Sequence, residues 1–186
     1  MLNTYVASLC ADDAPMVRRA AAKHLGLVAG KADISNVLAK ILPAYEKLCI
    51  KDTDSVRVLA MAQTSALAQL LNNEQMSQTL LRIIQDCHRD RSWRVRLALA
   101  NDLGAIAEAG GKEFCSAYIL SIVMVLIDDP EPEVRECAIR QLVPICAVVG
   151  EEAFGKACLV EINQTRFAEE EAVSYTHLTL PTTPYV

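Results

Sequence analysis

A Val-Arg pair recurs at a constant 39-residue step along most of this sequence. The four pairs are Val17-Arg18, Val56-Arg57, Val95-Arg96 and Val134-Arg135. Apolar residues keep the same step on either side: eleven positions before the valines stand Val6, Tyr45, Ile84 and Val123, and eleven positions after them stand Val28, Leu67, Ile106 and Ile145. Such a period predicts a stack of similar units, because one unit of this size cannot bury its apolar face alone.

Within each unit the apolar spacing is helical. Val56, Ala60, Leu67 and Leu71 follow the pattern i, i+4, i+11, i+15, which is one face of a helix. A similar stripe precedes each Val-Arg pair, so we expect a first helix, a short polar turn and a second helix. We place first helices near 1–10, 37–50, 74–87, 112–127 and 151–167, and second helices near 14–29, 55–71, 93–109 and 133–149. Pro144 falls inside the last of these and should kink it.

The predicted fold is therefore all-α, an α-solenoid of stacked antiparallel helix pairs. Two helices in each unit of this length favour HEAT repeats over the shorter tetratricopeptide units. The expected repeats are 1–32, truncated at its start, then 33–72, 73–111, 112–150 and a partial 151–173. Residues 174–186 lack charged side chains and hold four threonines and two prolines. We expect them to be a non-native or disordered tail, with a short linear motif as the alternative, and the chain to come from the middle of a longer array.

Composition narrows the function classes. Hydrophobic residues make up 52% of the chain, which excludes wholesale disorder. The net charge of −5 argues against nucleic acid as a partner. The seven cysteines form no CxxC pair, which predicts a reducing compartment with no disulfides and no metal site. The longest apolar run, 119–127, is too short to span a membrane. We expect a cytoplasmic location, with the nucleus as a further possibility.

The turns between paired helices carry a recurring acid and arginine. An acid stands four or five residues before each valine, at Asp13, Asp52, Asp90 and Asp129. The recurring arginines are Arg18, Arg57, Arg96 and Arg135. Because these residues occur in every unit, we expect them to be structural: each arginine bonds the acid of its own or the adjacent turn, and together they form a ladder along the stack.

Turn residues that differ between units are the candidates for partner contact. Trp93 is the only tryptophan, and a large ring with an N–H donor at a turn is typical of an interface anchor; packing on a neighbouring turn is the alternative. Arg94 beside it offers a planar guanidinium to partner acids. The remaining candidates are Pro15, Met16, Arg19, Asp54 and Ser92.

Catalytic motifs are missing from the sequence. It has no HExxH, no GxSxG, no Gly-rich phosphate loop and no His-Glu dipeptide, and its three histidines lie far apart. We therefore expect no catalytic residue, no cofactor and no enzymatic activity.

Three stretches resemble one family closely. LCADDAPMVRRAAAKHLG (9–26), DTDSVRVLAMAQTSALAQLL (52–71) and DRSWRVRLALANDLG (90–104) are similar in string, order and spacing to the HEAT-repeat scaffold (A, 65-kDa regulatory) subunit of protein phosphatase 2A. The resemblance covers residues 2–150 well and 151–167 loosely, in the middle of the family's array.

The resemblance implies a non-catalytic scaffold that docks regulatory (B-type) subunits on the turns. It implies that the catalytic subunit binds through repeats missing here. The alternatives are another HEAT-repeat adaptor, such as a nuclear transport receptor, and a spacer with no docking surface.

Overall fold

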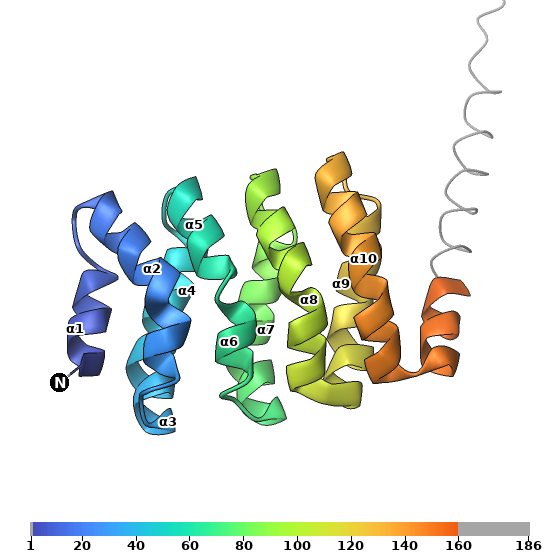
Figure 1. Cartoon of the computed structure of the whole chain (residues 1–186), viewed down its shortest axis with the longest axis horizontal. Helices are drawn as coiled ribbons and strands as arrows, with labels where there is room; N and C mark the ends of the chain where they lie inside the picture. The colour runs from blue at the N-terminus through green and yellow to red at the C-terminus, as the bar shows by residue number, and fades with distance from the viewer. Residues whose placement is uncertain (1, 160–186) are drawn as a thin grey trace, which may run out of the picture.

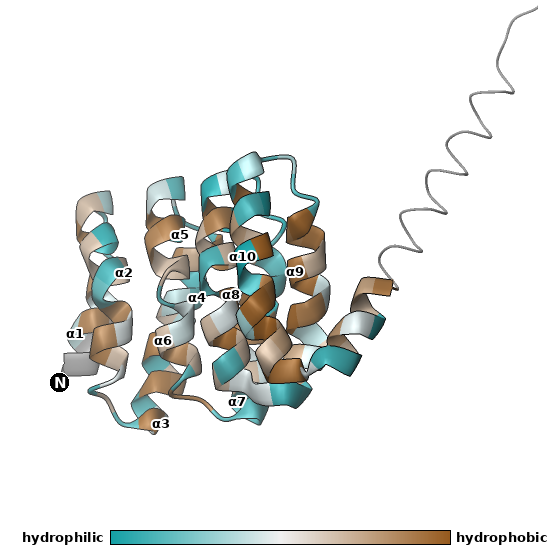
Figure 2. Cartoon of the chain, turned by 45° about the vertical axis from the view of Figure 1, so that its right-hand side comes forward, coloured by the Kyte–Doolittle hydropathy of each residue, from teal (hydrophilic) through white to brown (hydrophobic). Residues whose placement is uncertain are grey.

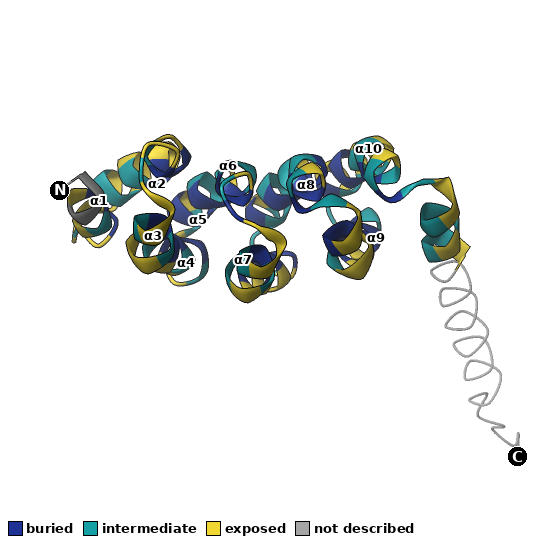
Figure 3. Cartoon of the chain, turned by 90° about the horizontal axis from the view of Figure 1, so that it is seen from below, coloured by how far each residue is buried: buried dark blue, intermediate teal, exposed yellow. Residues whose placement is uncertain are grey.

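The computed structural model describes residues 2–159, which form one extended stack of helix pairs (Figure 1). Seen from below, the helices lie in two layers, with the buried residues on the faces that meet (Figure 3). Every regular element in this part of the chain is helical, so the prediction of an all-α solenoid is confirmed. The remainder of the expected fifth first helix, 160–167, and the tail 174–186 lie outside the described residues.

The outer layer contains the first helix of each pair. Its elements are α1 (Leu2–Leu9), α3 (Ile34–Asn36) continued by the π-helical turn η1 (Val37–Ile41) and α4 (Leu42–Ile50), α7 (Asn73–Cys87), and η2 (Cys115–Ile119) with α9 (Leu120–Ile127). Residues 151–159 add a further helix. The inner layer contains α2 (Pro15–Ala29), α5 (Asp54–Met61) with α6 (Thr64–Ala68), α8 (Trp93–Phe114) and α10 (Pro132–Val149).

The columns found in the sequence form the core between the layers. Tyr45, Ile84 and Val123 are completely buried, and so are Leu67, Ile106 and Ile145 in the opposite layer. Figure 2 shows α9 hydrophobic along almost its whole length, as expected for a helix covered by neighbours on two sides. Burial of this surface drives the stacking, because each pair covers the apolar face of the next.

The second helix of the 33–72 repeat is broken, which corrects the continuous helix expected over 55–71. It stops at Met61 and restarts at Thr64. The Thr64 hydroxyl donates to the Met61 carbonyl at 2.5 Å, and the Ser65 N–H donates to Asp102 at 2.7 Å. Both partners of the helical bond from Ser65 to Met61 are thus engaged elsewhere, so the helix opens.

Glycines end two of the inner helices. Gly111 (φ 69°) and Gly150 (φ 88°) have the positive φ that glycine adopts without strain. The segment Trp93–Ile127 is long and apolar enough, by length and composition, to cross a membrane. Half of its most apolar window is buried in the stack, and the chain bends at Gly111.

Two prolines lie within the helical runs. Pro43 lies in the first turn of α4, just after the π-helical turn η1. A proline has no backbone N–H to donate to a helical hydrogen bond, and the wider π-helical turn lies directly before this position. Pro144 was expected to kink its helix, and α10 nevertheless runs as one element from Pro132 to Val149. The ring of Pro144 packs against Gly104 of α8, where an added Cβ would lie 2.8 Å from Pro144 Cγ.

Candidate docking ridge and its supporting ladders

The four turns that join paired helices lie along one edge of the stack, at the top of Figure 1. They comprise residues 10–14, 51–53, 88–92 and 128–131. We call these turns, with the first five residues of the inner helix that follows each, the turn ridge. All the residues singled out from the sequence lie on it.

Arginines link consecutive turns of the ridge through paired hydrogen bonds. Arg18 donates from Nε and Nη2 to the Asp52 carboxylate at 2.6 and 2.9 Å. Arg57 binds Asp90 in the same way at 3.0 and 2.9 Å. Arg96 binds Asp129 at 2.6 and 2.8 Å. Each arginine thus bonds the acid of the next repeat in the two-pronged geometry that is strongest for a guanidinium and a carboxylate.

The third nitrogen of each arginine holds its own turn. Arg57 Nη1 donates to the Asp52 carbonyl, and Arg96 Nη1 donates to the Asp90 carbonyl. Arg135 makes the same bond to the Asp129 carbonyl at 2.7 Å. We call this set of contacts the outer ladder. The guanidinium groups of Arg18, Arg57 and Arg96 each join their own turn through the backbone and the next turn through a side chain.

In the first turn, Asp12 takes the position that the sequence assigned to Asp13. The Asp12 carboxylate accepts from the N–H of Ala14, as Asp90 accepts from Ser92 and Asp129 from Glu131. Asp13 is exposed and contributes its backbone carbonyl to Arg18.

The outer ladder is electrostatically matched. The hydrogen bond from Arg18 is the main reason why the pKa of Asp52 lies below its ordinary value. For Asp129, burial raises the pKa, but the hydrogen bonds from Arg96 and from the Glu131 N–H outweigh burial and the net pKa is lowered. Both acids are charged at neutral pH. Arg57 is 4% exposed, so its pairing with Asp90 is shielded from solvent.

Trp93 begins α8 and is half-buried. Part of its ring packs against the core. The Arg94 guanidinium carbon lies 4.6 Å from the ring centroid and Arg94 is exposed. Stacking of this kind holds a cation at the surface in a defined position. Ser92, half-buried, precedes the tryptophan as the N-cap residue of α8.

Three of the other candidate residues are exposed at the start of α2. Pro15 and Arg19 are exposed, and Met16 is 79% exposed. Met16 and Arg19 line a hollow of about 360 Å³ with Lys23 of the same helix and Leu59 of α5. Asp54 is half-buried at the start of α5, with its Oδ1 3.6 Å from Arg57 Nη2.

A second series of contacts joins the inner helices and was not found from the sequence. Asp102 accepts from the N–H and the hydroxyl of Ser65, and Gln141 accepts from the Gly104 N–H at 3.1 Å. Gln63 lies against Gly26 at the same place in the preceding pair. We call these contacts the inner ladder. The polar residues of this ladder recur at the period of the repeat (Gln63, Asp102, Gln141), which was the signal available in the sequence. On a single helix considered alone, however, they look like solvent-exposed positions.

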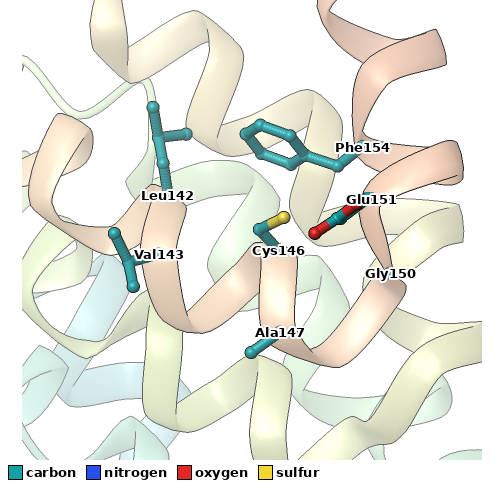
Figure 4. Close-up of a pocket in the computed structure, with 7 residues that line it drawn as sticks. All are labelled: Leu142, Val143, Cys146, Ala147, Gly150, Glu151 and Phe154. Atoms are coloured by element: carbon teal, nitrogen blue, oxygen red, sulfur yellow. The ribbon is translucent and has the colours of Figure 1, made fainter.

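An open groove follows the last inner helix. It has a volume of about 530 Å³ and is lined mainly by apolar side chains of α10, among them Leu142, Val143 and Cys146, with Phe154 facing them from the next helix (Figure 4). The equivalent residues of α8, Leu103, Gly104 and Ala107, are buried under α10. The groove therefore has the character of an inter-repeat face.

Potential metal-ligating side chains are dispersed within residues 2–159. That part of the chain holds no cluster of three or more His, Cys, Asp or Glu side chains arranged for a metal. The seven cysteines are free thiols, five of them buried. Burial raises the pKa of the Cys87 thiol to about 12, which keeps it protonated and unreactive.

Stacked helix pairs, joined by an outer and an inner ladder and presenting a row of turns, define a protein of the helical-repeat α-solenoid class. Within that class, the chain belongs to the family described as PIK3R4-like, middle domain, whose model matches residues 29–168.

Individual relatives agree with this class. The chain is 31% identical over 104 residues to the A regulatory subunit of protein phosphatase PP2A from Schizosaccharomyces pombe, covering 55% of this chain and 18% of that protein. A designed armadillo repeat protein matches with a TM-score of 0.60 at 22% identity, over 84% of this chain and 70% of that one. An engineered protein matches with a TM-score of 0.59 at 18% identity, over 84% and 67%. The two structures bear on the fold alone.

Proposed function

We propose that this chain is a non-catalytic scaffold segment that docks a regulatory subunit of protein phosphatase 2A along its turn ridge. The observation that carries the proposal is the contrast between shared and repeat-specific residues on the ridge. Arg18, Arg57 and Arg96 form ion pairs within the fold. Met16, Arg19 and Arg94 are exposed, and neither of these two arginines makes an ion pair among the described residues. The likeness to the Schizosaccharomyces pombe protein supports the phosphatase as the particular complex.

The ladders explain how such a ridge would bind. A partner lying along the stack meets one turn per repeat, so its affinity depends on the spacing of several contacts. The outer ladder fixes that spacing through ion pairs between neighbouring turns. Binding to turns that are already ordered loses less conformational entropy than binding to mobile loops.

Holding two proteins on one solenoid raises their effective concentration and sets their mutual orientation. In this proposal the chain contributes the regulatory-subunit contacts, the catalytic subunit binds through other repeats, and the complex is cytoplasmic. No step of the chemistry falls to residues of this chain.

The test is binding of the full chain to a panel of phosphatase 2A regulatory subunits, measured by calorimetry, with the catalytic subunit serving for specificity. Trp93→Ala should weaken binding by at least about 1 kcal/mol, roughly fivefold, because an interface aromatic is lost. Arg82→Gln, at an exposed site in the outer layer, is the matched control and should leave binding unchanged.

Circular dichroism of each variant must show unchanged helical content. A folded wild-type chain that binds none of the regulatory subunits would overturn the phosphatase assignment and favour another helical-repeat adaptor. Equal binding by Trp93→Ala and the wild type would place the docking site elsewhere than the turn ridge.

A further inference from the structure

A hollow of about 490 Å³ opens between α7 and the η2–α9 helix, in the outer layer. Its rim includes Gln85, Arg89 and Ser121, and its apolar wall includes Ile122 and Val125. The chain turn 88–92 lies at one end of it, but neither ladder uses the residues that line it.

The hollow lies where a contact across the preceding groove has no counterpart. Between α4 and α7, Glu46 Oε1 lies 3.7 Å from Arg82 Nη1 and the pair crosses the groove. One repeat later, the equivalent positions hold Gln85 and Ser121. Neither residue makes a contact across the groove among the described residues, so the space stays open.

A buried histidine stands at the end of the hollow, at a position that is apolar in the other repeats. Cys10, Cys49 and Ile127 occupy the equivalent places. His88 is 8% exposed and its Nδ1 has no hydrogen-bond partner within the described chain. Burial, with a smaller effect from Arg89, lowers the pKa of His88, so its ring is neutral at pH 7. Since an apolar residue satisfies the fold here, the imidazole is not needed for packing.

The imidazole orients an arginine. Arg89 donates from Nε to His88 Nε2 at 3.0 Å, which only a neutral imidazole with a free lone pair can accept. The two terminal nitrogens of Arg89 have no hydrogen-bond or ion-pair partner among residues 2–159, and Arg89 is exposed on the rim. A fixed guanidinium with free donors is suited to a carboxylate or a phosphate.

We propose that this hollow binds a carboxylate carried on an apolar stem, with Arg89 on the carboxylate and the stem against Val125 and Ile122. Val125 is 45% exposed, so it offers apolar surface that contact with a ligand would cover. Asp86 also lines the hollow, and its negative charge disfavours a phosphate dianion more than a single carboxylate. His88 is a positioning residue, since it holds Arg89 through the Nε bond.

The experiment is a titration of the ¹⁵N-labelled full chain followed by NMR at the Arg89 Nε–H and the His88 ring. The probe is 3-phenylpropionate; 3-phenylpropionamide controls for charge and inorganic phosphate controls for the stem. Saturable shifts of both resonances with the carboxylate, and at least tenfold weaker binding of the amide and of phosphate, are expected. Equal binding of the amide, tighter binding of phosphate, or no saturable shift in the folded chain would overturn the proposal.

Three variants separate recognition from folding. Arg89→Gln should weaken binding at least tenfold with the fold intact, because its side chain is exposed. His88→Cys places the residue of the equivalent column at this position, so the repeat should stay folded while the Arg89 Nε–H resonance moves and affinity falls. The double variant Gln85→Glu/Ser121→Arg recreates the crossing pair of the preceding groove and should close the hollow. Unchanged affinity in Arg89→Gln or in the double variant would show that the probe binds elsewhere.

Discussion

Asp102 of α8 accepts two hydrogen bonds from Ser65 of the preceding repeat, one from the backbone N–H at 2.7 Å and one from the hydroxyl at 2.8 Å. The contact fastens two repeats together and takes the N–H that would otherwise continue the broken helix. Burial raises the pKa of Asp102, and the Ser65 bonds only partly offset that rise. Burial of the charged carboxylate therefore costs desolvation free energy, and the two hydrogen bonds from Ser65 offset part of that cost.

Removing this carboxylate tests the inner ladder. Asp102→Ala leaves two donors of Ser65 unpaired and should lower the free energy of unfolding by about 2 kcal/mol in urea. Asp102→Asn should cost less than half as much, because its carbonyl oxygen still accepts one bond. Glu108→Ala, an exposed site on the same helix, is the control with little effect. Equal losses in Asp102→Ala and Asp102→Asn would mean that charge, rather than hydrogen bonding, matters here.

Breaking the outer ladder should be more damaging than breaking a surface pair. Arg57→Ala leaves Asp90 without its partner in a shielded site and should cost about 3 to 5 kcal/mol. Arg82→Ala removes contacts of a side chain that is 75% exposed and should cost less than about 0.5 kcal/mol. Chemical denaturation of both variants gives the comparison. Similar losses in the two would contradict a structural role for the ladder.

Two acids of the outer ladder predict how the free energy of unfolding changes with pH under acidic conditions. Asp52 and Asp129 have pKa values below the ordinary 3.8, so their contribution is fully present above that pH. It should be lost as the pH falls through their folded-state values, since the unfolded chain binds protons first. Urea midpoints measured from pH 5 down to pH 2 check this, and Asp129→Asn should flatten the slope in that window.

His88 predicts a second pH dependence at a higher range. Its folded-state pKa lies below the ordinary 6.5, so the unfolded chain takes up the proton first as the pH drops. Stability from this residue is complete above pH 6.5 and falls as the pH is lowered towards the folded-state value. His88→Cys should remove that slope between pH 6.5 and 5. A slope that persists in the variant would assign the dependence to another group.

Two inner helices approach each other closely at Gly104, so we predict that this position does not tolerate a larger residue. A Cβ at Gly104 would lie 2.6 Å from Gln141 Oε1 and 2.8 Å from Pro144 Cγ, so Gly104→Ala should destabilise the chain by about 1 to 3 kcal/mol. Gly30→Ala is the matched control, since its nearest contact is 3.6 Å and its φ is helical. Thermal melts of the two variants distinguish the effects, and a stable Gly104→Ala variant would show that the interface can relax.

The comparisons with known proteins and the variants proposed above bear on different features of the chain. Family membership and the Schizosaccharomyces pombe relative concern the helical repeat, whereas the proposed docking residues rest on their exposure and position in this chain. Trp93→Ala therefore tests the docking site, and Arg57→Ala tests the frame that holds it.

The period, the helix pairs and the buried columns could all be predicted from the sequence, because the helical spacing of apolar residues shows which face of each helix is buried. Residues such as Tyr45 and Ile106 could be assigned to the core from position alone. The sequence also indicated a structural role for the arginines of the turns, because a charged residue that recurs in every unit is expected to stabilise the repeat rather than to contact one partner.

The contacts that join neighbouring repeats could be assigned only in the folded chain. Three features depend on contacts between neighbouring repeats. Arg57 binds the acid of the following turn, and Asp102 opens the helix at Ser65. A hollow lies beside Gln85 and Ser121. Polar side chains at such positions look solvent-exposed in any single helix. Their partners lie about one repeat away along the chain, and the stacking angle of the helix pairs, which local periodicity does not encode, brings them within hydrogen-bond distance.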